Sequence, residues 1–252
     1  MPRFALILPA AGRSTRFGSV LDDKKPYVPL DGRAVWLRAI DPFLKRDDVV
    51  QWIVVISPED RELFERRYRP SVAFLDIQVV EGGAERFDSV AKGLAAIRDD
   101  CDHVAIHDAA RPCVTPAIID AVFAAAVRHG AALPGVAVAD TLKRVDDQLR
   151  TVETVSRAGL YAVQTPQAFR KDLLLQAHAM RPQLPSHVVV TDDAQLVEAT
   201  GHACQIVVGD AQNLKITTQA DLALASSILK SRLTPEREPT PRRLGDEGEL
   251  WD

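Results

Sequence analysis

The segment after the first apolar run of the chain is small and basic, a composition that suits phosphate binding. "LPAAGRSTRFG" (residues 8–18) contains three consecutive residues without bulky side chains, namely Ala10, Ala11 and Gly12. Successive backbone amides in such a loop can form an anion-binding concavity. The cations in and after the loop are Arg13, Arg16, Lys24 and Lys25. Because guanidinium and ammonium groups bind phosphate, we predict a phosphate-binding loop rather than a turn with solvated basic residues. It matches neither G-x-G-x-x-G nor G-x-x-x-x-G-K-[ST].

A second stretch, "EGGAERFDSV" (81–90), combines two glycines with a serine. Gly82 and Gly83 lack a Cβ, so the backbone there can approach a flat ligand such as a nucleobase closely. Ser89 can hydrogen-bond the edge of a base. The alternative is a glycine turn with Ser89 facing solvent, and this motif alone does not decide between the two.

The most suggestive acidic residue is Asp108 in "HDAARP" (107–112), which directly follows an apolar run. A buried carboxylate is costly unless it meets a cation or a metal. Mg²⁺ is typically held by one or two carboxylates together with phosphate oxygens. Arg111 can pair with Asp108 or with a phosphate, and a purely structural Asp108–Arg111 turn is the alternative. His103 and His107 lack a third ligand, which favours packing over a zinc site.

Several later residues can contact a polar, phosphorylated acceptor. They are Thr141, Arg157, Thr165 and Thr191. Each has a structural alternative; Thr191, for example, can simply begin a helix. Lys215 in "NLKIT" (213–217) alternates with apolar neighbours, so it points away from the core, either into a site or as an exposed lysine on an edge strand.

These candidates need a scaffold that brings them together, and the alternation of apolar runs with helical patterns predicts one. The runs predicted to be strands are 4–8, 52–56, 77–81, 103–107, 132–138 and 205–209. Most are apolar on both faces, which is typical of a parallel sheet covered by helices on each side. The predicted helices are 85–98, 116–130, 192–201 and 219–233. We therefore predict an α/β fold with an open, mostly parallel sheet, whose strands present ligand-binding residues at their carboxyl ends.

The segment 138–161 interrupts this alternation. "TLKRV" and "TVETV" flank "DDQLR", a pattern that predicts a projecting β-hairpin arm. A lone hairpin is marginally stable, so we expect it to pack on something else, such as a second subunit. We predict a single domain over residues 1–233, followed by a disordered tail, 234–252, that is rich in proline and charge.

The composition excludes several classes of protein. The net charge of −4 over 252 residues gives no general attraction to nucleic acid or to anionic membranes. No apolar run approaches the roughly 20 residues that cross a bilayer. Three cysteines without ligand spacing indicate a reducing cytoplasm. A signal peptide at the start of the chain is a minor alternative, because Arg13 and Arg16 follow the apolar stretch at once.

Taken together, the motifs resemble those of a known family, the 2-C-methyl-D-erythritol 4-phosphate cytidylyltransferases. The matching stretches are "PAAGRSTR", "GGAERFDSV", "HDAARP", "DTLKR", "TPQAF", "TDDA" and "NLKIT", in the family's order over about residues 3–232. The resemblance implies a Rossmann-like fold of the nucleotidyltransferase type, CTP as donor and Mg²⁺ as cofactor. It also implies a homodimer whose hairpin arms reach the partner's site.

The resemblance also implies roles for individual residues. It assigns the nucleotide to Ala10, Ala11, Gly12, Gly83 and Ser89. It assigns the phosphates and catalysis to Arg16, Lys25 and Lys215, and Mg²⁺ to Asp108. It assigns the acceptor to Arg111 and Thr191, with Thr141, Arg157 and Thr165 coming from the partner's arm. Two departures stand out: "KKPYV" replaces the family's usual P-K-Q-Y, which leaves Lys24 open beside Lys25, and Ala84 replaces a common acidic residue.

The activity implied is the transfer of CMP from CTP to 2-C-methyl-D-erythritol 4-phosphate in non-mevalonate isoprenoid precursor synthesis. The alternatives are a ribitol-5-phosphate cytidylyltransferase, a guanylyltransferase of molybdenum-cofactor assembly, and a non-catalytic nucleotide-binding protein of the same fold. A dehydrogenase is disfavoured because the glycine fingerprint is missing.

Overall fold

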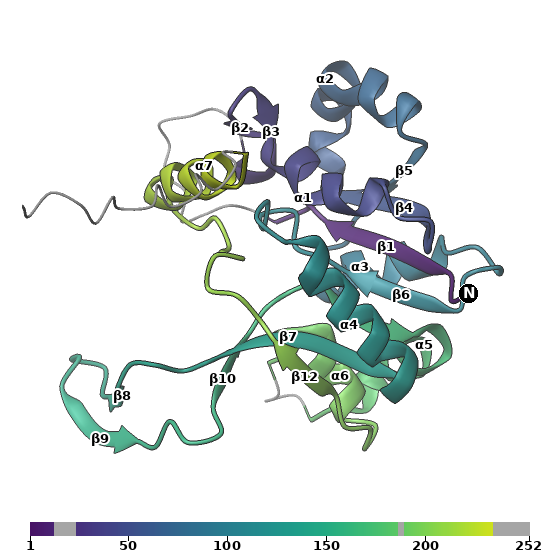
Figure 1. Ribbon diagram of the computed structural model, residues 1–252. Coiled ribbons are helices and arrows are strands. Elements are labelled where there is room, and N and C mark those ends of the chain that lie inside the picture. The colour runs from purple at the N-terminus through teal and green to yellow at the C-terminus, as the bar shows by residue number, and fades with distance from the viewer. Residues whose placement is uncertain (13–23, 186–188, 234–252) are drawn as a thin grey trace, which may run out of the picture.

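An open eight-stranded sheet runs through the middle of the molecule (Figure 1). The structure is a computed structural model and describes residues 1–12, 24–185 and 189–233. The strands at the six predicted runs are β1 (Phe4–Pro9), β4 (Val49–Ile56), β5 (Ile77–Glu81), β6 (His103–Ile106), β7 (Ala131–Ala137) and β12 (Gln205–Val208). The neighbours β6–β1–β4–β5 are parallel, and so are β12 and β7. The predicted α/β fold with a mostly parallel sheet is confirmed.

Two short strands went unpredicted, and both run against the rest of the sheet. They are β10 (Tyr161–Val163) and β11 (Gln167–Arg170). β10 pairs with β7, while β11 lies between β6 and β7, and each pairing is antiparallel. They have three and four residues, and β11 has a polar residue at each end, so no long apolar run marks either strand. They place Thr165, which lies between them, beside the end of β6.

Helices cover both faces of the sheet. Alternate residues of β1 point to opposite faces, and each set packs against a different group of helices. Phe4, Leu6 and Leu8 join one buried cluster with residues of α1 (Val35–Leu44), α2 (Arg61–Phe74) and α4 (Pro116–His129). Ile7 joins another with residues of α3 (Arg86–Ala95), α5 (Lys171–Met180) and α6 (Asp193–Glu198). Strands with both faces buried explain the continuous apolar runs in the sequence.

The capping signals place three helix boundaries as predicted, while the predicted end of the 192–201 helix is wrong because α6 stops at Glu198. α4 begins after Thr115, whose side chain accepts a hydrogen bond from the backbone of Ile118, and ends at Gly130 with φ of 85°. α6 begins after Asp192, whose side chain accepts from the backbone of Gln195 in the same way. α1, α2 and α5 were not predicted. The first two contain an internal proline, Pro42 and Pro70, a residue that usually ends a helix.

Several further elements lie outside the main sheet. They are η1 (Lys25–Tyr27), β2 (Pro29–Leu30), β3 (Arg33–Ala34), η2 (Pro58–Asp60), η3 (Arg181–Gln183) and α7 (Gln219–Leu233). α7 packs against the β2–β3 ribbon through a third apolar cluster that includes Val28, Ile216 and Ile228. This packing anchors the segment that carries Lys215.

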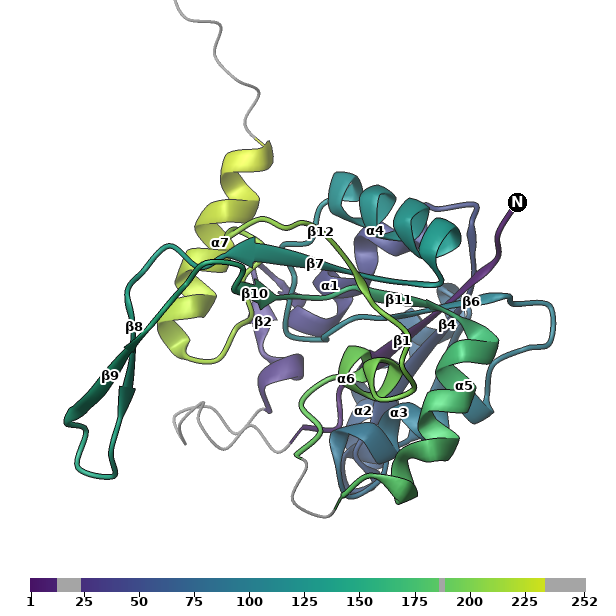
Figure 2. The same ribbon diagram turned by 90° about the horizontal axis from the view of Figure 1, so that it is seen from below.

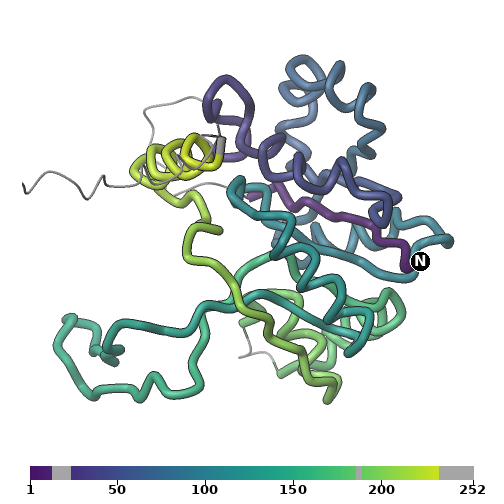
Figure 3. Tube along the Cα trace, in the orientation of Figure 1, coloured from purple at the N-terminus to yellow at the C-terminus, as the bar shows by residue number. Residues whose placement is uncertain are grey.

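A hairpin stands apart from the main sheet. β8 (Leu142–Val145) and β9 (Thr151–Val155) form a separate antiparallel pair, with Leu142 opposite Val155. Two views at right angles show it extending from the body (Figures 1 and 2), and the Cα trace leaves the sheet for it after β7 and returns at β10 (Figure 3). Its use as an arm toward a second copy stays a prediction. The predicted tail, 234–252, lies outside the described residues, as do Arg13 and Arg16.

No helix among the described residues is long and apolar enough to span a bilayer.

Candidate active site

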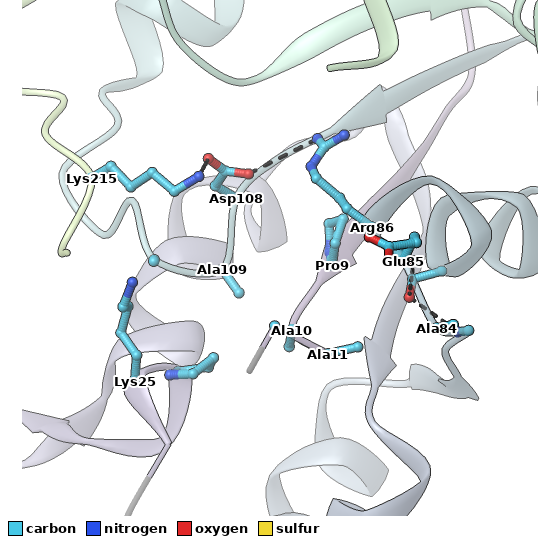
Figure 4. Close-up of a pocket in the computed structure, with 15 residues that line it drawn as sticks. Pro9, Ala10, Ala11, Lys25, Ala84, Glu85, Arg86, Asp108, Ala109 and Lys215 are labelled. Atoms are coloured by element: carbon cyan, nitrogen blue, oxygen red, sulfur yellow. Dashed lines mark hydrogen bonds and ion pairs between the residues drawn. The ribbon is translucent and has the colours of Figure 1, made fainter. Parts of the chain in front are cut away.

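The carboxyl ends of the parallel strands open onto a cavity of about 520 Å³. Its walls come from the loops that follow β1, β5 and β6, joined by the segments around Lys25 and Lys215 (Figure 4). The lining residues are Pro9, Ala10, Ala11, Gly12, Lys25, Pro26, Gly83, Ala84, Glu85, Arg86, Ser89, Asp108, Ala109, Ala110 and Lys215. The fold therefore gathers four stretches that the sequence analysis singled out separately.

The loop after β1 forms one wall of the cavity. The amide of Ala10 donates to the carbonyl of Val55 at 2.7 Å, so Ala10 anchors the loop to β4 and its amide is not available to a ligand. An added Cβ at Gly12 would meet no atom of the described residues within 4 Å. Among those residues, none packs so closely on Gly12 that it excludes a side chain there. Arg16, the predicted phosphate contact further along, lies outside the described residues.

The paired glycines after β5 are required by the helix that follows them. A Cβ on Gly82 would lie 2.6 Å from Oγ of Ser89, and one on Gly83 would lie 2.4 Å from Cβ of Asp88. The close approach is thus to α3 of the same chain. Ser89 Oγ accepts a hydrogen bond from the amide of Gly83 and donates one to the carbonyl of Glu85. Toward a ligand this hydroxyl is therefore left with acceptor capacity.

Asp108 lies between three cations. Its carboxylate is 2.8 Å from Nζ of Lys215, 3.5 Å from Nε of Arg111 and 4.0 Å from a terminal nitrogen of Arg86. Figure 4 shows Lys215 and Arg86 approaching it from opposite sides. Burial alone would raise the pKa of Asp108, but Lys215, Arg86 and Arg111 outweigh burial and hold the pKa well below its usual range. Asp108 is therefore ionised at neutral pH.

Sequence reasoning missed Arg86, which lines the cavity beside Asp108. Its guanidinium is 2.6 Å from a carboxylate oxygen of Asp193, a residue with no exposed surface. His178 lies on the other side of Asp193, with Nε2 3.4 Å from the carboxylate. Burial lowers the pKa of Arg86, but Asp193 and Asp108 outweigh it and raise the pKa. The signal was within reach, because Arg86 opens α3 directly after a strand end in the quoted stretch "GGAERFDSV".

Hydrogen bonds link Asp108 to Thr165 and His107, and the donor in each bond can be assigned. Nε2 of His107 lies 3.0 Å from the carbonyl of Arg111, and a carbonyl only accepts, so Nε2 carries the proton. Neutral Nδ1 then accepts from the hydroxyl of Thr165 at 3.0 Å, and that hydroxyl accepts from the amide of Asp108 at 3.0 Å. Complete burial lowers the pKa of His107 to about 4, which keeps it neutral.

These hydrogen bonds place Thr165 elsewhere than the resemblance implied. The resemblance implied a contribution from a partner's arm, whereas here Thr165 is buried beside Asp108 of its own chain. The reason is that β10 and β11 carry the segment back into the main sheet before Thr165 is reached. Its hydroxyl positions the backbone of Asp108.

The structure separates the two candidate lysines. Lys25 lines the cavity. Nζ of Lys24 turns the other way and lies 2.8 Å from Asp60 and 3.6 Å from Glu59. Ala84, the departure after the glycines, also lines the cavity. Position 84 therefore brings no carboxylate to that wall, and only its backbone is available for a polar contact with a ligand.

The remaining predicted residues lie outside the cavity wall. Arg111 lies behind Asp108 and donates to the carbonyl of Asn213 at 2.7 Å. Thr191 is exposed and bonded through its hydroxyl to Gln195, at the start of α6. Thr141 and Arg157 are exposed near the base of the hairpin, where Arg157 donates to the carbonyl of Ala139. Within one chain these residues do not converge on a single point.

One carboxylate at the cavity, that of Asp108, suits a divalent cation that takes its other ligands from water and substrate. Among the residues the structure describes, no group of three or more His, Cys, Asp or Glu could enclose a metal ion. Asp108 is ionised and lies at the cavity with three cations nearby. Mg²⁺ is usually bound through one or two carboxylates plus water and substrate phosphates, so Asp108 suits that ion once a polyphosphate is present.

A mostly parallel α/β sheet with a cationic cavity over its strand ends, but without a dinucleotide or P-loop fingerprint, favours a nucleotidyltransferase of the Rossmann-like class.

Comparison with known proteins then identifies the particular family. The family model for 2-C-methyl-D-erythritol 4-phosphate cytidylyltransferase matches residues 4–231. A protein of that name from Alkaliphilus oremlandii is 38% identical, over 90% of this chain and 95% of its own length. The crystal structure of the protein of that name from Thermus thermophilus has a TM-score of 0.74 and 32% identity, covering 91% of this chain and 100% of that one. This chain belongs to the 2-C-methyl-D-erythritol 4-phosphate cytidylyltransferase family.

Some relatives are longer. A bifunctional enzyme IspD/IspF from Rhodospirillum rubrum is 43% identical over 91% of this chain, which spans 58% of that protein.

Proposed function

We propose that this protein transfers CMP from CTP to 2-C-methyl-D-erythritol 4-phosphate, giving 4-diphosphocytidyl-2-C-methyl-D-erythritol and pyrophosphate. The observation that carries the proposal is the ionised Asp108 among Lys215, Arg86 and Arg111 at the cavity. Family membership supports cytidylyl transfer over the alternatives. The ribitol-5-phosphate reaction is the nearest of these, because it differs only in the acceptor.

The chemistry proposed is attack by an oxygen of the acceptor phosphate on the α-phosphorus of CTP, with pyrophosphate leaving in line. A phosphate monoester has a second pKa of about 6 and is largely dianionic at neutral pH. It needs no general base. The cavity accordingly requires groups that hold and neutralise phosphates rather than a nucleophile or a proton acceptor.

The residues of this chain divide that task by position. The backbone from Ala11 to Gly12 and the hydroxyl of Ser89 line the cavity and are proposed to contact the nucleotide. Lys25 and Lys215 approach from the opposite side and supply positive charge to the phosphates (Figure 4). Preorganised charges of this kind stabilise the transition state because they need no rearrangement during the reaction. Arg16 is proposed as a further phosphate contact.

Asp108 is proposed to hold Mg²⁺. When bound, the ion would supply charge neutralisation at the phosphates. The three cations around Asp108 keep its carboxylate ionised, and this is the protonation state that a metal ligand requires.

The acceptor site is proposed to need a second copy of the chain. Thr141 and Arg157 lie at the hairpin, away from the cavity of their own chain. Apolar side chains on and beside it, including Val152, Tyr161 and Val163, are exposed. A cytoplasmic homodimer in which the hairpin of one copy approaches the cavity of the other would cover them. Arg111 and Thr191 are proposed as the acceptor contacts supplied within the chain.

Pyrophosphate release tests the proposal directly. The full-length protein is mixed with CTP, Mg²⁺ and 2-C-methyl-D-erythritol 4-phosphate, and we expect pyrophosphate in amounts stoichiometric with the nucleotide product. GTP in place of CTP, and omission of Mg²⁺, serve as controls and should give little release. Release with CTP and ribitol 5-phosphate, but not with CTP and 2-C-methyl-D-erythritol 4-phosphate, would select the alternative acceptor. No pyrophosphate release with any donor and acceptor would instead indicate a non-catalytic binding protein.

A further inference from the structure

Lys25 stands on a single turn of 3₁₀ helix, and a carboxylate outside the cavity holds the residues on both sides of it. We propose that Asp60 is a positioning residue for Lys25, acting through Lys24 and Tyr27. The inference rests on the proposed function, because it assigns Lys25 a task that depends on accurate placement. Nothing in the family resemblance requires it, since Lys24 is part of this chain's departure from the usual P-K-Q-Y.

The first observation is that Asp60 uses a different oxygen for each neighbour of Lys25. Its Oδ1 is 2.8 Å from Nζ of Lys24. Its Oδ2 accepts a hydrogen bond from the hydroxyl of Tyr27 at 3.2 Å. The amide of Tyr27 donates to the carbonyl of Lys24 at 2.8 Å and closes the turn between them. The carboxylate, the two side chains and the turn thus form a closed loop that contains Lys25.

The second observation is that Asp60 and Tyr27 are buried and that Tyr27 has further anchors of its own. The hydroxyl of Tyr68 on α2 donates to the carbonyl of Tyr27 at 3.2 Å, and the ring of Tyr27 packs against Phe64 and Tyr68. Asp60 is 5% exposed. Burial and Asp60 both raise the pKa of Tyr27, so its phenol keeps the proton that it donates.

The third observation concerns the direction in which the side chain of Lys25 points. In a 3₁₀ turn, residues three apart lie on the same side. Lys24 and Tyr27 are three apart and both turn toward Asp60, so Lys25 must point elsewhere, and it points into the cavity. Pro26 follows it with a fixed φ, which limits how the turn can relax. Holding the flanking residues therefore sets the direction of the Lys25 ammonium.

Asp60→Asn tests the proposal, because it keeps the shape of the side chain and removes its charge. We expect kcat to fall between about tenfold and a hundredfold, in line with the cost of misplacing a catalytic group by about 1 Å. Affinity for CTP, measured by calorimetry without acceptor, should fall as well. Lys24→Gln should lose activity in the same direction, and Lys24→Arg, which restores the cation, should recover it.

The double variant with Lys25→Ala is decisive. If Asp60 acts through Lys25, adding Asp60→Asn to Lys25→Ala should change kcat and CTP affinity by less than about twofold. If the loss of kcat in the double variant equals the product of the losses in the two single variants, Asp60 has a general structural role and the proposal is overturned. Asp41→Asn is the matched control, because Asp41 pairs with Arg33 at 2.7 Å outside the cavity; it should leave both backgrounds unchanged.

Two further arms keep the test informative. Should Asp60→Asn not fold, Tyr27→Phe removes only one hydroxyl and enters the same double-variant cycle. Should the parent protein release no pyrophosphate with any acceptor, the proposed function fails. The cycle read by CTP affinity then still decides whether Asp60 acts through Lys25.

Discussion

At the scale of single residues, the cavity is governed by an excess of positive over negative charge around Asp108. Lys215, Arg86 and Arg111 surround one carboxylate, while Asp193 balances Arg86 from behind. Lys25 adds charge from another wall. The protein as a whole carries a net charge of −4. Attraction for a polyphosphate is therefore local, as the sequence analysis anticipated.

Removing either cavity lysine should slow turnover strongly while leaving the fold intact. Loss of one preorganised donor to a transition-state oxyanion costs about 2.7–4 kcal/mol. We expect Lys25→Ala and Lys215→Ala each to lower kcat at least about a hundredfold, with circular dichroism unchanged. Lys230→Ala is a suitable control, since Lys230 lies on α7 and pairs with Asp31 outside the cavity. Near-normal turnover in both cavity variants would refute the assigned roles.

The neutral state of His107 predicts a dependence of stability on pH. Its pKa falls from an ordinary 6.5 to about 4 on folding. Between those values the unfolded chain binds a proton that the native protein does not, so the free energy of unfolding decreases as pH falls from about 6.5 to about 4. The contribution amounts to about 3 kcal/mol at full effect.

Chemical denaturation at several pH values measures this contribution. His107→Asn removes the titrating group, so the stability advantage of the parent over the variant should shrink as pH falls through this window. An advantage that stays constant from about pH 7 to about pH 4 would contradict the assignment of His107 as a buried neutral residue.

At the scale of elements, the β8–β9 hairpin has few contacts within the described chain that could stabilise it. Within the described residues its strands pair with each other and not with the main sheet, and Val145 and Val152 are largely exposed. An isolated two-stranded hairpin is marginally stable in water. Its charged pair of Arg144 with Glu153 is exposed and contributes little. A partner surface is the simplest source of the missing burial.

Deleting residues 142–156 tests whether this element makes the dimer. We expect the full chain to sediment as a dimer and the deletion variant as a monomer with weakened acceptor turnover. Because the hairpin has its own sheet, the main sheet should survive its removal. A deletion variant that sediments as an unchanged dimer would refute the arm-exchange arrangement.

The other elements show where local patterns were sufficient. Thr115 and Gly130 mark the ends of α4, and Asp192 marks the start of α6. Each signal depends on residues within a few positions of one another. α1 and α2 were missed because an internal proline in each suggests a break, yet Phe43 and Phe64 are held by burial in the core. Tertiary packing there outweighs a local preference.

At the scale of the whole molecule, the sequence by itself determined the α/β class and the identity of the strand ends that carry chemistry. Apolar runs with both faces buried can be recognised without coordinates, and so can the small, basic or acidic residues that follow them. In a parallel sheet those ends share one edge. This is why Gly12, Gly83 and Asp108, far apart in the chain, could be expected at one site.

Only the tertiary structure decided which charges meet. Arg86 and Asp193 are 107 positions apart, and no period or motif links them. Lys24 and Lys25 are adjacent and alike, yet one pairs with Asp60 and the other enters the cavity. Thr165 could be placed only once β10 and β11 were known to return the chain to the sheet. The physical reason is that strand periodicity is a local property, whereas the direction of a charged side chain depends on partners supplied by the packing of distant elements.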